Sequence, residues 1–219
     1  MTISRRARRL VDMERDVKRT TSNGSTARGV VCLALLWIAL VSGCASTPTR
    51  FYTLSAMPGA VASPSDLSVS VGPVAIPAIV DRPQFIVRVG ANQVAVDEFN
   101  QWASPLQNNI ARVVAENLTA MLGTERITLS SQILGVDAVY RAMIDVQRFD
   151  STPGEGATFD AAWMVLRSRD GVKQTGRTTA REASQEPGYA ALAAAHSRAV
   201  ARLSQDIATA VRALDGAAQ

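Results

Sequence analysis

A run of twelve consecutive apolar residues, Val30 to Val41, divides the chain into two parts of different composition. Before it, residues 1–29 carry eight Lys and Arg residues against three acidic ones and show no apolar periodicity. A basic segment, an apolar stretch of about 7–15 residues and small residues behind it are typical of a secretory signal. As a helix, the run rises only about 18 Å, short of the roughly 30 Å hydrocarbon core of a bilayer. We therefore predict that residues 1–43 are a cleaved signal and that the fold lies in the residues after it.

The residues that end the apolar run make this prediction more specific. Val41-Ser42-Gly43-Cys44 resembles the lipobox of bacterial lipoproteins, in which a cysteine becomes the lipidated N-terminus. The resemblance implies a diacylglycerol on the Cys44 sulfur and an acyl chain such as palmitate on its amino group, enough chains for a stable anchor. Ala45 rather than an aspartate follows Cys44, which favours the periplasmic face of the outer membrane by analogy with lipoprotein sorting. The alternatives are that Cys44 follows an ordinary cleaved signal and that Met13 is the true start.

Removal of the signal changes what the composition means. The whole chain has 23 basic and 19 acidic residues, which at first favours an acidic partner such as nucleic acid. Eight of the basic and three of the acidic residues precede residue 44, so the side chains of the remaining residues sum to −1. Cys32 also leaves with the signal, so we expect neither a disulfide nor a thiol nucleophile in the mature domain.

We interpret residues 44–49 as a lipidated tether and residues 50–219 as one periplasmic domain. Alternation of apolar and polar residues, together with β-branched and aromatic residues, predicts strands. They are expected at 50–54, 67–71, 85–89, 93–96, 126–130, 138–149, 157–167 and 172–182. Gly90-Ala91-Asn92 and Asp170-Gly171 have the composition of hairpin turns.

Two helices are expected between and after these strands. Ser104, Pro105 and Gln107 suggest a capping box with proline at the first helical position. An apolar stripe from Leu106 to Met121 follows, and Gly123 supplies a stop. The second helix is expected at about 189–214. The order of elements predicts an α/β fold of the α+β type, a two-layer sandwich with two long helices on one face of a mixed, mostly antiparallel sheet.

The search for catalytic and metal-binding groups finds few. His196 is the only histidine, so a Ser-His-Asp hydrolase would have to use it as the base, although a structural histidine in a helix is the simpler interpretation. Asp97-Glu98 is the densest carboxylate pair and is interpreted as a solvated turn. The dinucleotide, P-loop and zincin motifs do not occur. We therefore expect no catalytic residue, no metal site and no cofactor apart from the covalent lipid on Cys44.

A proline-rich segment is the best candidate for contact with a partner. Three prolines at 73, 77 and 83 restrict the backbone around Asp81-Arg82-Pro83-Gln84. A rigid surface that combines apolar and charged residues loses little entropy on binding, although a well-made connection between strands is an equal alternative. Trp102, just ahead of the first helix, would either cover the edge of the core or anchor a partner.

Several of these segments, taken in order, resemble the PqiC-like ABC-type transport auxiliary lipoproteins. The matching segments are Phe51-Tyr52-Thr53-Leu54, the Val-Gly-Pro-Val-x-Ile-Pro stretch from Val71, Asp81-Arg82-Pro83-Gln84 with Val87-Arg88, Phe99 to Leu106, and Asn109-Ile110. Each segment alone is unspecific, but their order and spacing are characteristic. The long N-terminal extension departs from the family pattern, as does Ala78-Ile79-Val80, where many relatives have an aromatic residue.

The resemblance implies a non-catalytic outer-membrane lipoprotein that faces the periplasm. It would act beside an MCE-domain protein and inner-membrane ABC or permease-type components that move lipids between the two membranes, and it implies possible homo-oligomeric rings and no nucleic-acid partner. Two other functions remain open at this point. One is a periplasmic hydrolase of lipid or envelope material that uses His196. The other is a direct lipid carrier with a pocket between helices and sheet.

Overall fold

The structure is a computed structural model that describes residues 47–57, 59, 62–130 and 138–217. The expected signal, residues 1–43, and Cys44 lie outside the described residues. The described residues form eight strands and two helices. In chain order they are β1 (Arg50–Tyr52), β2 (Val69–Ala75), β3 (Gln84–Gly90), β4 (Gln93–Trp102), α2 (Leu106–Leu122), β5 (Ile127–Leu129), β6 (Tyr140–Thr152), β7 (Gly156–Arg167), β8 (Lys173–Ala183) and α3 (Tyr189–Gly216).

The strands form two sheets of mixed strand orientation. The larger sheet has the order β5-β2-β6-β7-β8, in which β2 is parallel to β5 and β6 and the other pairs are antiparallel. The smaller sheet has the order β1-β4-β3, with β1 parallel and β3 antiparallel to β4. The expected α+β fold is confirmed. Its division into two sheets was not expected, because alternation fixes which face of a strand is buried but not which strand it pairs with.

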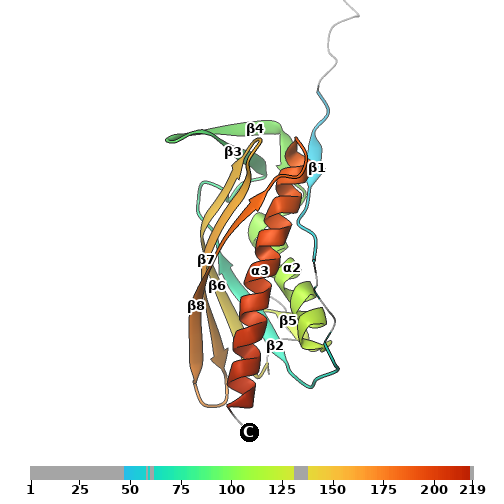
Figure 1. Cartoon of the computed structure of the whole chain (residues 1–219), viewed down its shortest axis with the longest axis vertical. Helices are drawn as coiled ribbons and strands as arrows, with labels where there is room; N and C mark the ends of the chain where they lie inside the picture. Colours follow the sequence, from blue (N-terminus) through green and yellow to red (C-terminus); the bar gives the residue numbers. More distant parts are fainter. Residues whose placement is uncertain (1–46, 58, 60–61, 131–137, 218–219) are drawn as a thin grey trace, which may run out of the picture. The chain divides into compact units, whose positions relative to one another are not determined.

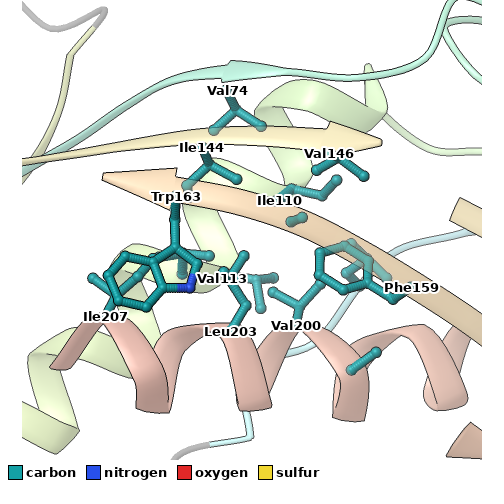
Figure 2. Packing of buried hydrophobic residues seen from close by; sticks show 14 of the residues in the cluster. Val74, Ile110, Val113, Ile144, Val146, Phe159, Trp163, Val200, Leu203 and Ile207 are labelled. Atoms are coloured by element: carbon teal, nitrogen blue, oxygen red, sulfur yellow. The ribbon is translucent and has the colours of Figure 1, made fainter. Parts of the chain in front are cut away.

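Both helices cover the same face of the five-stranded sheet. In Figure 1, α3 runs along β6, β7 and β8, and α2 lies beside it over β2 and β5. Figure 2 shows how the two layers interlock, with side chains of the sheet packed against side chains of the two helices. The labelled residues are Val74, Ile144, Val146, Phe159 and Trp163 from the sheet, Ile110 and Val113 from α2, and Val200, Leu203 and Ile207 from α3. This interface is the main hydrophobic core.

One close approach in this core depends on a glycine. Trp163 on β7 pairs with Gly176 on β8, and a Cβ at Gly176 would lie 2.2 Å from Cζ2 of the indole. The absence of a side chain therefore lets the ring lie over β8. There the indole Nε1–H donates to Thr178 Oγ1 at 3.1 Å, which satisfies the one polar group of the buried ring.

Of the two ends predicted for α2, only the C-terminal one is confirmed. Gly123 has a left-handed backbone (φ 65°, ψ 39°), and a Cβ there would lie 2.1 Å from the carbonyl oxygen of Ser63, so the expected stop is confirmed. The expected capping box is wrong. Pro105 keeps an extended ψ of 126° and becomes the cap residue itself, and within the described residues no side chain makes a capping hydrogen bond to this helix. Ser104 therefore stands one residue too far from the first turn.

The remaining elements follow the sequence closely. The hairpin between β3 and β4 turns at Ala91-Asn92, and the β7–β8 hairpin turns at 168–170 before Gly171. Helix α3 starts at the expected residue and continues two residues beyond the expected end. In Figure 1 the β3–β4 hairpin and β1 lie at one end of α3, and the β7–β8 turn lies at the other.

Candidate functional site

The connection between the two sheets, residues 77–84, is an exposed loop on a fixed backbone. Val80 is 6% exposed, and its N–H donates to the Pro77 carbonyl at 3.0 Å, which closes a tight turn. At the other end the Pro83 carbonyl accepts the Trp102 N–H at 2.7 Å, which ties the loop to β4. Between these points Ile79 is 49% exposed. The loop therefore presents an apolar side chain on a well-anchored backbone.

The charged residues of this loop are free to meet a partner. Asp81, Arg82 and Pro83 are exposed, and Gln84 is half-buried. Among the described residues, the side chains of Asp81 and Arg82 make no hydrogen bond or ion pair, whereas Gln84 Nε2 donates to Glu98 Oε2 at 3.2 Å. A partner could engage both charges without breaking an existing contact.

Trp102, the fifth expected interface residue, lies next to this loop, but its side chain points into the core. It is 5% exposed, its ring stacks on Phe85 with centroids 4.4 Å apart, and it meets the edge of Phe149 at 6.0 Å. Phe85 and Trp102 belong to the small sheet and Phe149 to the large one. Of the two expected roles for Trp102, the geometry therefore matches the first, which is covering the edge of the core.

His196 is enclosed in the same region. The residue is 0% exposed, and its ring stacks face to face on Phe149 with centroids 3.7 Å apart. Nε2 lies 2.9 Å from Ser151 Oγ, and Nδ1 has no hydrogen-bond partner among the described residues. Burial lowers the pKa of His196 to about 3, against a smaller opposing effect of Asp150. The ring is therefore neutral throughout the range in which proteins normally work.

This environment differs from that of a catalytic Ser-His pair. Ser151 is 2% exposed, so a substrate could not reach its hydroxyl without opening the core. The Nδ1 of a catalytic histidine is normally oriented by a carboxylate, whereas no carboxylate in the part of the chain that the structure describes bonds to Nδ1 of His196. The geometry favours a structural role in which His196 joins α3 to β6.

Asp97, which the sequence suggested to lie in a solvated turn, instead connects the small sheet to α3. Asp97 Oδ1 accepts the N–H groups of Phe99 and Asn100, both at 2.9 Å, and Oδ2 accepts the Tyr189 hydroxyl at 2.6 Å. Burial acts to raise the pKa of Asp97, but these hydrogen bonds outweigh it and lower the pKa below the usual value. Burial and Asp97 raise the pKa of Tyr189 to about 12. The pair joins β4 to the first residue of α3.

An apolar groove of about 590 Å³ lies on the large sheet. Met143 and Met164, a cross-strand pair, line it together with Ala162. These residues alternate with buried ones on β6 and β7, so the groove opens on the face opposite the helices. The space between helices and sheet, where a lipid pocket was the expected alternative, is occupied by core side chains.

No cluster of three or more His, Cys, Asp or Glu side chains that could hold a metal ion occurs in residues 47–57, 59, 62–130 and 138–217. In the same residues, neither helix has the length and apolar content required to cross a bilayer.

Comparison with known families decides the relationship. The sequence profile of the family described as "ABC-type transport auxiliary lipoprotein component" matches residues 52–208. The chain belongs to this family. The match begins eight residues after Cys44, so the auxiliary-lipoprotein domain directly follows the expected anchor.

Solved structures support the same fold. An uncharacterised protein shares 21% identity at a TM-score of 0.59, over 74% of this chain and 98% of that one. A Xanthomonas campestris protein of the family DUF330 shares 19% identity at a TM-score of 0.59, over 78% of this chain and all of that one. No curated protein matches significantly. At these identities the likeness supports the α+β fold alone.

The roles of the residues that shape the small sheet were not predicted from the sequence. Nothing local indicated that Asp97 would accept three hydrogen bonds, because one donor, Tyr189, lies 92 residues further along the chain. The exposed positions of Phe51 and Phe99 were equally hidden, since aromatic residues in a strand normally predict burial.

Proposed function

We propose that the protein is a lipoprotein anchored through Cys44 in the outer membrane, where it acts as a non-catalytic auxiliary component of an ABC/MCE-type lipid transport system. Residues 1–43 would be the cleaved signal, 44–49 the tether and 50–219 the periplasmic domain. Family membership supports the transport role. The lipobox sequence supports the anchor. The domain would dock the periplasmic end of an MCE-domain conduit and the transport components behind it.

The observation that carries the docking role is the loop Asp81-Arg82-Pro83-Gln84. It combines two unpaired charges with a backbone held at Pro77 and Pro83. A preorganised loop of this kind binds with little loss of chain entropy, and its opposite charges give a partner directional recognition. We assign Trp102 to the support of this loop, because its N–H holds the Pro83 carbonyl.

The enclosed position of His196 supports the non-catalytic part of the proposal. A hydrolase that used His196 would need a path from solvent to Ser151, and both residues are at most 2% exposed. Replacing His196 with glutamine should leave any ester hydrolysis by the purified protein at the same level as the wild type. Loss of a measurable esterase activity in that variant would instead favour the enzyme.

Affinity purification from solubilised envelopes tests the docking role. The full lipidated chain should recover an MCE-domain protein, and Arg82→Glu should reduce that recovery several-fold. Arg169→Glu is the matched control, because Arg169 is also exposed, has only a long 3.7 Å contact with Asp170 and follows the end of β7. Equal recovery by Arg82→Glu and wild type, or no MCE-domain protein at all, contradicts the proposal.

The anchor has its own test. Mass spectrometry of the mature N-terminal peptide should find Cys44 as the first residue, with a diacylglycerol and an added acyl chain. The protein should sediment with the outer-membrane fraction, and Cys44→Ala should abolish both results. An unmodified Cys44 after cleavage at another position would remove the anchor from the proposal.

Ring assembly is a separate part of the proposal, carried over from the family resemblance. Light scattering of the lipidated protein in detergent should give a protein mass several times the mass of one chain. A single-chain mass across a wide concentration range would contradict a ring, without affecting the anchor or the docking loop.

The apolar groove supports a second candidate function, direct lipid carriage. A volume of about 590 Å³ is within the range of small-molecule sites, and its lining includes Met143 and Met164, flexible side chains that adapt to different ligands. Native mass spectrometry should find phospholipid on the wild type but not on Met164→Glu. Lys173→Glu, an exposed β8 position outside the groove, should retain the lipid. Wild-type protein free of lipid would rule this function out.

A further inference from the structure

The small sheet has one face on the core and one face in solvent, and the solvent face carries aromatic side chains. Tyr52 pairs with Trp102 and both point inward, so their neighbours Phe51 and Gln101 point outward. Phe51 is 63% exposed and Phe99, further back along β4, is 48% exposed. Two uncovered phenylalanines on one sheet surface are unusual for a water-exposed domain.

These side chains are not exposed through looseness of the chain. A bulge in β4 between Asp97 and Gln101 is fixed by the hydrogen bonds from the Phe99 and Asn100 N–H groups to Asp97. The Tyr52 hydroxyl donates to Asn100 Oδ1 at 2.7 Å, which locks β1 to the same bulge. These hydrogen bonds therefore hold the Phe99 side chain toward solvent, where it is not buried.

The same apolar surface continues along β4 into the hairpin. Val94 and Val96 alternate with the half-buried Ala95 and Asp97 and are 38% and 43% exposed. Four of the nine exposed large apolar side chains of the described residues share this face of the sheet: Phe51, Val94, Val96 and Phe99. The polar residues Arg50, Glu98 and Gln101 lie between or beside them.

The length of chain before β1 indicates what covers this surface. Five residues lie between Cys44 and Arg50, so the six Cα–Cα steps of a fully extended tether span at most about 20 Å. An anchor at Cys44 therefore keeps β1 close to the headgroups of its own membrane. Aromatic side chains framed by polar ones are the type of surface that settles at a membrane interface.

We propose that the outward face of β1 and β4, with Phe51 and Phe99 at its centre, inserts into the interfacial layer of the membrane that carries the lipid anchor. This contact would fix the orientation of the domain on the membrane, which the tether alone cannot do. The inference rests on the proposed anchor at Cys44. Because the contact is apolar and the flanking charges have both signs, it should persist at high salt.

A depth measurement on the lipidated protein tests the contact. Cys44 would be blocked by its lipid, so Gln101→Cys offers one reactive thiol on the outward face for an environment-sensitive nitrobenzoxadiazole label. Val172→Cys, 43% exposed in the β7–β8 connection at the other end of α3, is the control. Both proteins are placed in vesicles of phosphatidylethanolamine and phosphatidylglycerol that contain a doxyl-labelled lipid.

The label at residue 101 should show blue-shifted emission and several-fold stronger quenching by the doxyl lipid than the label at residue 172. Adding Phe51→Ser and Phe99→Ser to Gln101→Cys should return its signal to the level of the control. Equal quenching at 101 and 172 overturns the inference. An apolar signal at 101 that the doxyl lipid does not quench also overturns it and indicates contact with a second copy.

The same experiment distinguishes failure of this inference from failure of the proposed anchor at Cys44. If the labelled protein fails to float with the vesicles, the anchor is wrong. If it floats and the label at residue 101 remains in water, the anchor stands and the sheet does not insert.

Discussion

The two sheets of the domain differ in how much of their apolar surface is buried. The five-stranded sheet buries its apolar face under α2 and α3, where Phe159 and Trp163 are at most 9% exposed. The three-stranded sheet buries Phe85 and Trp102 in the same way but leaves Phe51 and Phe99 uncovered on its other face. The large sheet thus contributes most of the buried core, whereas the small sheet, with the loop that leads into it, leaves aromatic and charged side chains exposed.

The largest expected effect concerns the large sheet. Leu203 on α3 is 0% exposed and packs in the core of Figure 2. Leu203→Ala should lower the free energy of unfolding by about 2–5 kcal/mol, because it removes buried methyl groups and leaves a cavity. Gln205→Ala on the exposed face of the same helix should change it by less than about 0.5 kcal/mol. Denaturant titration measures both. Similar values for the two variants would break the comparison.

The second largest expected effect is a loss of stability in acid, caused by the buried His196 between α3 and β6. His196 has a pKa of about 3 in the folded protein against 6.5 for the ordinary side chain, so the unfolded state takes up a proton first. Stability is therefore present above about pH 6.5 and is lost as pH falls toward 3, by about 2 kcal/mol between pH 6.5 and 5. His196→Gln should be less stable at neutral pH, with a flatter profile. Urea titrations across this range measure the slopes, and equal slopes would contradict the assignment.

The attachment of the small sheet to α3 should depend on Asp97. Asp97→Ala leaves the Tyr189 hydroxyl and two N–H groups without their acceptor, which should cost about 1–2 kcal/mol. Hydrogen exchange should accelerate in β3 and β4 more than in β7. The neighbouring Glu98→Ala, which loses only an exposed contact with Gln84, should have little effect. Uniform acceleration in both sheets would show that the small sheet has no independent attachment.

The smallest effect on stability is expected at Phe51, a residue at the centre of the proposed membrane contact. Phe51→Ser removes a side chain that is 63% exposed, so the free energy of unfolding should change by less than about 0.5 kcal/mol. Thermal unfolding of the lipidated protein in detergent measures this. A loss comparable to that of Leu203→Ala would mean that Phe51 belongs to the core and would remove the contrast between the two sheets.

The parts that could be predicted from sequence are those governed by local patterns. Alternation along β6, β7 and β8 and the stripe along α3 located these elements to within a few residues. The parallel pairing of β1 with β4 and of β2 with β6 could not be predicted, because parallel neighbours are joined by long connections that leave no local signal. The separation into two sheets follows from those pairings.

The candidate site shows the same limit. The loop Asp81-Arg82-Pro83-Gln84 was found from its prolines, which constrain the backbone wherever they occur. Trp102 was a candidate because it is an aromatic residue just ahead of a helix, where it would cover the core edge or anchor a partner, and its side chain packs on Phe85 in the core. Whether an aromatic side chain near a helix start faces a partner or the core depends on strands that pair across the fold, and a local pattern does not report them.

Hydrogen–deuterium exchange of the lipidated protein, in vesicles and in detergent, tests most directly the claim that the small sheet is the contact surface. On vesicles, the amides of β1 and of the β4 bulge around Phe99 should exchange several-fold more slowly than in detergent. The amides of the β7–β8 turn around Gly171 should exchange equally in both. Equal exchange at both ends of the domain, or protection confined to the β7–β8 turn, would contradict the account.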